Sequence, residues 1–235
     1  MNDVSYSYGD TQALRGVSLV LNPGTTTALI GPSGSGKSTL ATLIARFDDP
    51  ESGSIRLGGV DLRDISSRDL YNMVSFVLQD PMLINASIGR NISLAKPEAS
   101  LEEIREAART AQIDDFIMSL PKGYDSVLGT DCSLSGGEGQ RVSIARALLA
   151  DTPILIMDEA TSALDSVTEA AIQASLEKLS RGRTTIVVAH RLATVRGADH
   201  IAVIDKEGVS EYGTHQELME KNGLYAALWN TQKLS

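Results

Sequence analysis

The stretch that decides the fold, residues 27–45, reads TALIGPSGSGKSTLATLIA. Its centre, GPSGSGKS at residues 31–38, matches the phosphate-loop pattern GxxxxGK[ST], with an apolar strand before it and a helical pattern after it. Glycines let successive N–H groups turn toward a phosphate, the amine of Lys37 can neutralise its oxygens, and the hydroxyl of Ser38 can bind Mg²⁺. The flanking strand and helix favour this reading over a merely flexible Gly/Ser loop, so the stretch predicts a phosphate-binding loop.

Apolar runs rich in β-branched residues recur on both sides of this loop and alternate with helical periodicity. The pattern predicts an α/β fold, a P-loop NTPase core with a largely parallel sheet. The predicted strands are residues 27–30, 73–78, 154–157, 184–189 and 201–204. The predicted helices are residues 38–45, 101–111, 113–120, 142–149 and 171–179.

The change of pattern along the chain predicts its domain organisation. Residues 4–8 and 17–21 alternate like an antiparallel hairpin around the Gly9–Asp10 turn, which predicts an N-terminal antiparallel β layer. Residues 80–150 show no strand pattern and form a predicted helical subdomain inserted in the core. The ATPase core with its β layer is therefore predicted at residues 1–79 and 151–235.

Composition limits the function classes. The 235 residues carry a formal net charge of −9, which argues against a broad nucleic-acid footprint but leaves a small phosphate ligand such as ATP open. No apolar run approaches the roughly 20 residues of a spanning helix. One cysteine, Cys132, cannot form an internal disulfide, and no secretory signal pattern is present, which predicts a reducing cytosolic setting.

Polar side chains follow three of the predicted strands directly. Gln79 follows the strand at 73–78, Asp158 and Glu159 follow the strand at 154–157, and His190 follows the strand at 184–189. Taken alone, the Asp158–Glu159 pair favours a solvated turn and His190 favours a structural histidine. Parallel strands, however, bring these ends to the sheet edge that also carries the phosphate loop. The expected roles are Mg²⁺ binding for Asp158, water activation for Glu159, bridging of metal and water for Gln79, and γ-phosphate contact for His190.

Residues 134–141 read LSGGEGQR and open the predicted helix at 142–149. Such a glycine turn is either a simple helix start or a second anion site, and the core already has its phosphate loop. If it is a second anion site, we expect it to contact a phosphate that is not bound to this chain's own phosphate loop.

These motifs, in this order, resemble the nucleotide-binding domain of ABC (ATP-binding cassette) transporters over essentially the whole chain. The resemblance implies that Tyr8 stacks on adenine and that SALD, residues 162–165, crosses a dimer interface. It implies a head-to-tail pair with a second nucleotide-binding domain, identical or homologous, in which Ser135 and Gly137 contact the partner's γ-phosphate. It also implies ATP hydrolysis that drives a transmembrane domain, in the same or a separate chain, at the cytoplasmic face of a membrane.

The predicted site follows from the motifs and the resemblance together. The expected catalytic residues are Glu159, His190, Gln79 and Lys37, and the expected metal ligands are Ser38, Gln79 and Asp158. The expected ATP-binding residues are Tyr8, Gly31, Ser33, Gly34, Ser35, Gly36, Lys37, Ser38, Thr39, Ser135, Gly137 and Asp165.

The segment DPMLINASIGRNI after Gln79 resembles exporter-type members, in which an apolar patch receives the membrane domain. Met82, Leu83 and Ile84 are the expected patch, with core residues of the helical subdomain as the alternative. The chain departs from the family pattern at Glu138, Gly139, Thr130 and Asp131, and some siderophore importers share this architecture, so both transport directions stay open.

Two other functions fit parts of the sequence. A soluble mechanical ABC ATPase of DNA repair or translation would usually carry a coiled-coil insertion or a second cassette. An unrelated P-loop enzyme such as a small-molecule kinase would leave LSGGE unexplained.

Overall fold

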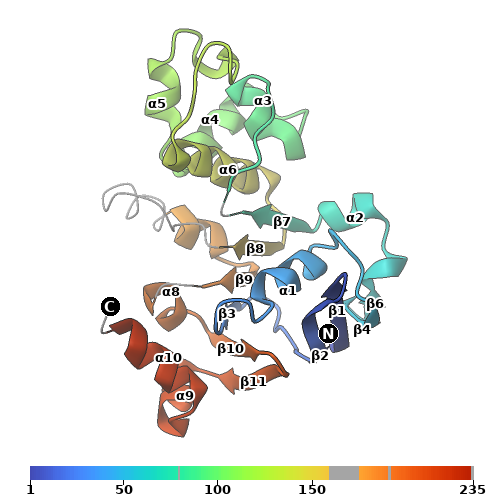
Figure 1. Ribbon diagram of the computed structural model, residues 1–235. Coiled ribbons are helices and arrows are strands. Elements are labelled where there is room, and N and C mark those ends of the chain that lie inside the picture. Colours follow the sequence, from blue (N-terminus) through green and yellow to red (C-terminus); the bar gives the residue numbers. More distant parts are fainter. Residues whose placement is uncertain (79, 159–174, 190–191, 234–235) are drawn as a thin grey trace. The chain divides into compact units, whose positions relative to one another are not determined.

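The computed structural model describes residues 1–78, 80–158, 175–189 and 192–233. The chain divides into two compact units (Figure 1). The first, called here the core unit, comprises Met1–Val74, Ile154–Asp158 and Gly182–Ser235, and the second, the helical unit, comprises Ser75–Pro153 and Glu159–Arg181.

The core unit is built on a mostly parallel sheet. Strands β3 (Thr26–Ile30), β8 (Ile154–Asp158), β9 (Thr184–Val188) and β10 (His200–Asp205) run parallel, and β11 (Gly208–Gly213) pairs antiparallel with β10. Their order is β11-β10-β3-β9-β8. The side chains of the four parallel strands are nearly all buried, which explains why the sequence shows continuous apolar runs here instead of alternation.

A second, antiparallel layer contains β1 (Asn2–Tyr8), β2 (Thr11–Val17) and β4 (Ser52–Ser54), in the order β2-β1-β4. The hairpin is confirmed, but its second strand was expected at residues 17–21 and lies at Thr11–Val17. The two-residue turn Gly9–Asp10 pairs Tyr8 with Thr11, and this fixes the register. The alternation of Val17, Leu19 and Leu21 reflects burial beside the sheet.

Helices and short elements complete the core unit. They are α1 (Lys37–Ile44), β5 (Arg56–Leu57), β6 (Val60–Asp61), the 3₁₀ turn η1 (Leu62–Asp64), α2 (Ser67–Tyr71), α8 (Leu192–Arg196), α9 (His215–Lys221) and α10 (Leu224–Lys233). Helix α1 confirms the helix expected directly after the phosphate loop.

The helical unit holds α3 (Ile88–Ile92), η2 (Ser93–Ala95), α4 (Leu101–Thr110), α5 (Asp114–Ser119), η3 (Gly123–Asp125) and α6 (Gly136–Ala150). Strand β7 (Val74–Val77) begins at the last residue of the core unit's first segment. Helix α6 packs against α3 and α4 through buried residues that include Val142, Ile144 and Ala145. Within the described ranges, no helix is both long and apolar enough to cross a membrane.

Candidate functional site

The phosphate loop lies where the backbone of the core unit is most crowded. Gly31 follows β3 with φ 150°, and a Cβ built there would lie 2.0 Å from the carbonyl oxygen of Ile204 in β10. Gly36, with φ 91°, would bring a Cβ to 2.4 Å from the carbonyl oxygen of Ala13 in β2. Only glycine tolerates these conformations and approaches without strain. The loop is therefore wedged between the parallel sheet and the antiparallel layer.

Lys37 begins α1 and is almost fully buried, at 5% exposure. Its Nζ donates to the carbonyl oxygens of Gly31, at 3.0 Å, and Pro32, at 2.9 Å. The ammonium group is thereby folded back over the loop, close to the backbone that would surround a phosphate. The hydroxyl of Ser35 is buried and finds no hydrogen-bond partner among the described residues. An anionic ligand would satisfy such a donor.

The loop and the end of β8 meet at one point. The Oγ of Ser38 donates to Oδ1 of Asp158 at 3.3 Å. A hydroxyl and a carboxylate so placed are oxygen ligands of the kind that a hard divalent cation prefers. No group of three or more His, Cys, Asp or Glu that could hold a metal occurs among the described residues. Two protein oxygens of this kind fit a cation such as Mg²⁺, which usually keeps water and substrate phosphate oxygens among its ligands.

The neighbouring strand β10 adds a wall that the sequence did not predict. Asp205 at the end of β10 and the turn residues Lys206 and Glu207 line a cavity of about 320 Å³ together with Pro32, Ser33, Gly34 and Ser35. The signal was present, because this strand also ends in charged residues at the edge that carries the phosphate loop. Thr39, expected to bind ATP, is buried in α1 one residue beyond Ser38.

Tyr8 ends β1 and is 57% exposed, so its ring is available to a planar ligand. It lies next to the hairpin turn between β1 and β2. Ala13 and Leu14 of β2 pack closely against Gly36 of the phosphate loop. This is the exposure required of a residue that stacks on adenine.

In the helical unit, Ser135 is the N-cap of α6 and is itself exposed. Its Oγ accepts from the N–H of Glu138 at 3.4 Å, and the Glu138 carboxylate accepts from the N–H of Ser135 at 2.7 Å. Glu138, which departs from the family pattern, thus completes a capping box. Gly136 has open space around it, whereas Gly137 is buried.

Gly139, another departure from the pattern, is explained by close packing. A Cβ at this position would lie 3.0 Å from Cγ of Pro81, within the segment 80–87. That segment is also held by Arg146, whose Nη1 donates to the carbonyl oxygen of Met82 at 3.0 Å. Met82 is 71% exposed and Ile84 46%, so these two side chains are not core residues, while Leu83 is half-buried against Gly139.

The loop that contains Thr130 and Asp131 is tightly closed beside this segment. Asp131 accepts from Lys122 Nζ at 2.7 Å and from the N–H of Val127 at 3.0 Å. The hydrogen bond from Lys122 holds the pKa of Asp131 below its usual value. An isolated antiparallel β-bridge pairs the backbone of Val127 with that of Ser87, at the end of the segment 80–87.

Gln79, Glu159, Asp165 and His190, and with them residues 162–165, lie outside the described residues. Their roles stay predictions.

Known proteins are similar to this chain over its whole length. A family model described as ABC transporter matches residues 14–162. The mycobactin import ATP-binding/permease protein IrtA of Mycolicibacterium smegmatis is 53% identical over 231 residues, which cover 98% of this chain and 27% of that protein. The ATP-dependent lipid A-core flippase of Desulfotalea psychrophila is 47% identical over 232 residues, 98% of this chain and 41% of the relative.

Among solved structures, a bacterial Atm1-family ABC exporter with ATP bound matches with a TM-score of 0.90 and 43% identity, over 98% of this chain and 41% of the other. The chain thus spans about a quarter to two fifths of the length of these relatives. Because these relatives are an import ATP-binding/permease protein, a lipid A-core flippase and an ABC exporter, the alternative of a soluble mechanical ATPase is not supported.

Proposed function

We propose, from the premise that this chain belongs to the ABC transporter family as its nucleotide-binding ATPase domain, that it hydrolyses Mg²⁺-bound ATP in a site completed by a second such domain. We further propose that this cycle drives a transmembrane domain at the cytoplasmic face of a membrane. Both steps go beyond family membership, because the chain corresponds to only part of its longer relatives.

The observation that supports the proposal most is the meeting of Ser38 with Asp158 at 3.3 Å, directly beside the buried Lys37. Ser38 and Asp158 offer two oxygen ligands for a cation, and Lys37 adds a positive charge. All three belong to the core unit, and Lys37 is adjacent to Ser38 in the chain. This is the arrangement that phosphoryl transfer requires, since its catalysis consists mostly of positioning and charge stabilisation.

The residues divide the chemistry among them. Lys37 and the loop N–H groups bind the β- and γ-phosphates, while Ser38 and Asp158 hold the cation, with Gln79 as a further ligand. Mg²⁺, when bound, supplies neutralisation of the charge that develops on the phosphate oxygens. Glu159, next to Asp158 in the chain, accepts a proton from the attacking water, and His190 donates a hydrogen bond to the γ-phosphate.

A second domain completes the site because the chain carries two anion-binding elements for one triphosphate. Ser135 and Gly137 at the start of α6 cover the γ-phosphate that is bound to the partner's loop, with Asp165 near the interface. The exposed Ser135 and the open space around Gly136 leave room for this contact.

The transmembrane domain is proposed to contact the exposed apolar side chains of Met82 and Ile84. The segment 80–87 is attached to α6 by the hydrogen bond from Arg146 to Met82 and by the close packing of Pro81 on Gly139. A displacement of this segment would therefore move α6, which begins directly after Ser135.

The test of the proposed function is Glu159→Gln. The amide is nearly isosteric but cannot accept the proton, so hydrolysis should fall by about two to four orders of magnitude while ATP binding persists. Size-exclusion chromatography should show a dimer with Mg²⁺-ATP and a monomer with Mg²⁺-ADP.

Two further variants serve as controls. Lys37→Ala in the Glu159→Gln background should abolish the dimer, and Glu98→Gln, an exposed carboxylate-to-amide change, should leave hydrolysis unaltered. Hydrolysis of Glu159→Gln near the wild-type rate would exclude Glu159 as the base.

A further inference from the structure

Tyr8 has an aromatic neighbour on its own strand. Tyr6 and Tyr8 are two residues apart in β1 and therefore point to the same face of the antiparallel layer. Their ring centroids lie 5.0 Å apart at an interplanar angle of 83°. This edge-to-face geometry is the favourable one for an aromatic pair. Tyr6 therefore limits the orientations that the exposed ring of Tyr8 can adopt.

Tyr6 is itself held from the far end of α1. Its hydroxyl donates a hydrogen bond to Oδ2 of Asp48, which lies 42 positions further along the chain. The bond raises the pKa of Tyr6 to about 12 and lowers the pKa of Asp48. The Tyr6 ring is thus tethered at its hydroxyl end while its edge contacts Tyr8.

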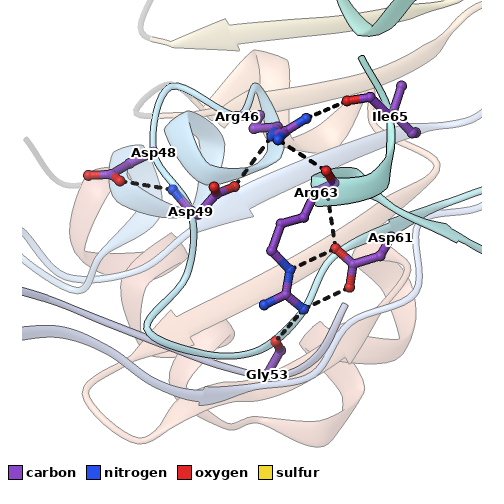
Figure 2. A network of polar contacts seen from close by, with 7 residues as sticks. All are labelled: Arg46, Asp48, Asp49, Gly53, Asp61, Arg63 and Ile65. Carbon is purple, nitrogen blue, oxygen red and sulfur yellow. Dashed lines mark hydrogen bonds and ion pairs between the residues drawn. The ribbon is translucent and has the colours of Figure 1, made fainter. Parts of the chain in front are cut away.

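The loop that holds Tyr6 is fixed in turn (Figure 2). The other carboxylate oxygen of Asp48 accepts from the N–H of Asp49 at 2.9 Å, and Asp49 pairs with Arg46 at 3.4 Å. The Arg46 guanidinium also donates to the carbonyl oxygens of Arg63 and Ile65. Arg46 thereby ties the chain that follows α1 to the segment around η1.

The same hairpin touches the phosphate loop at the other end of α1. Tyr6 is paired across the hairpin with Leu14 of β2, and the Leu14 side chain would lie 2.6 Å from a Cβ at Gly36. Helix α1 therefore carries the phosphate-binding Lys37 at its start and, through Asp48, the tether of Tyr6 beyond its end. Helix α1 thus connects the phosphate loop at its start with the residues that hold Tyr6 beside Tyr8, the residue proposed to stack on adenine.

We propose that Tyr6 is a positioning residue for the base of ATP: its ring edge, tethered by Asp48, presets the face of Tyr8 on which adenine stacks. The inference rests on the proposed function, since it requires Tyr8 to be the adenine platform. Presetting one ring lowers the conformational cost of binding and adds no contact to the ligand.

The test compares two ligands that differ only in whether they carry a nucleoside. The Kd of ATP and the Kd of inorganic triphosphate are measured by titration calorimetry on the 235-residue chain, in EDTA so that no turnover occurs. Tyr8→Ala should raise the Kd of ATP about tenfold or more, because a base-stacking contact is lost. Tyr6→Leu should raise it about threefold to tenfold, the value of an aromatic pair. Neither change should alter the Kd of triphosphate.

The double variant decides whether Tyr6 acts through Tyr8. In the Tyr8→Ala background, Tyr6→Leu should add less than about twofold, because coupled residues are not additive. Tyr6→Phe and Asp48→Ala keep the ring and remove only the tether, so each should give a smaller rise with the same non-additivity. If Tyr6→Leu does not fold, Tyr6→Phe and Asp48→Ala are measured in its place. Ser7→Ala is the matched control, since it removes a bond from the same strand to Glu51 that does not touch Tyr8.

The outcomes separate the two claims. If Tyr8→Ala leaves the Kd of ATP unchanged, the adenine platform itself is wrong. If Tyr8→Ala weakens ATP but the Tyr6 and Asp48 variants do not, the positioning role is wrong. An equal loss for Tyr6→Leu with and without Tyr8, or a weaker binding of triphosphate, would likewise overturn it.

Discussion

Gly31 brings the backbone of the phosphate loop against the backbone of β10. A methyl group there would collide with the carbonyl oxygen of Ile204, which has no flexible end that could move aside. Gly34 offers a comparison in the same loop, because it has φ 76° but open space around its Cβ position.

We therefore expect Gly31→Ala to lower the free energy of unfolding by a few kcal/mol, and Gly34→Ala by only about 1–2 kcal/mol, the cost of a left-handed residue. Urea unfolding without nucleotide measures both. Equal losses in the two variants would show that contact with β10 does not set the cost.

At the residue scale, the sequence predicted which candidate site residues come together better than it predicted the contacts that support them. The spacing of Lys37 and Ser38 and the strand end at Asp158 are local signals, and the structure brings Ser38 to Asp158 as expected. The tether of Tyr6 to Asp48 joins residues that only the packed β layer brings together. No local pattern records such a contact.

Two helices of the helical unit, α4 and α6, begin with the same N-terminal capping arrangement. Ser135 with Glu138 in α6, and Ser100 with Glu103 in α4, each form a complete Ser-x-x-Glu capping box. The two serines are therefore a matched pair for separating the cap from the proposed contact with a partner's γ-phosphate.

Ser135→Ala and Ser100→Ala should each cost about 0.5–2 kcal/mol of stability, since each removes an N-cap. Only Ser135→Ala should also weaken the ATP-driven dimer of the Glu159→Gln variant, measured by sedimentation at graded protein concentrations. If the two variants weaken the dimer alike, Ser135 acts through helix stability alone.

Asp114 is buried and joins α4, α5 and η3 through polar contacts with Arg105, Arg109 and Tyr124. Burial opposes its ionisation, but the hydrogen bond from Tyr124 at 2.6 Å and the guanidinium groups of Arg105 and Arg109 outweigh it and hold its pKa below the usual value. A lowered folded-state pKa stabilises the fold above the unfolded-state pKa of about 4, and this stabilisation is lost as the pH falls through the folded-state value.

The stability difference between the wild type and Asp114→Asn should therefore shrink as the pH is lowered from 5 toward 2. Chemical unfolding across this range measures it, and Asp115→Asn controls for the loss of an exposed carboxylate in the same turn. A difference that stays constant with pH would mean that the cluster does not depend on the charge of Asp114.

The sequence revealed long elements and missed short ones. Strands such as β3 and β9 stand out as continuous apolar runs, and helices such as α4 have enough residues to show a period. The pieces β4, β5 and β6 have two or three residues each, and their strand conformation depends on pairing with a partner. The hairpin's second strand was misplaced because burial beside the sheet imitates strand alternation after Val17.

At the scale of the whole molecule, the proposed function assigns one half of a nucleotide site to each unit. In this proposal the core unit supplies the phosphate loop, the cation ligands and Tyr8, and the helical unit supplies the start of α6 with Ser135. The central claim is that two chains each supply one half to a shared ATP.

The most direct measurement mixes two inactive variants. Lys37→Ala disables the phosphate loop of both sites in its dimer, and Ser135→Arg blocks both covering helix starts, so each variant alone should be inactive. In an equal mixture about half of all encounters join unlike chains, and such a pair has one intact site of two, so about a quarter of wild-type ATPase activity should return if the sites are independent. Activity above the sum of the separate variants is the predicted result. No recovery, in a chain whose Glu159→Gln variant dimerises with ATP, would contradict the shared site.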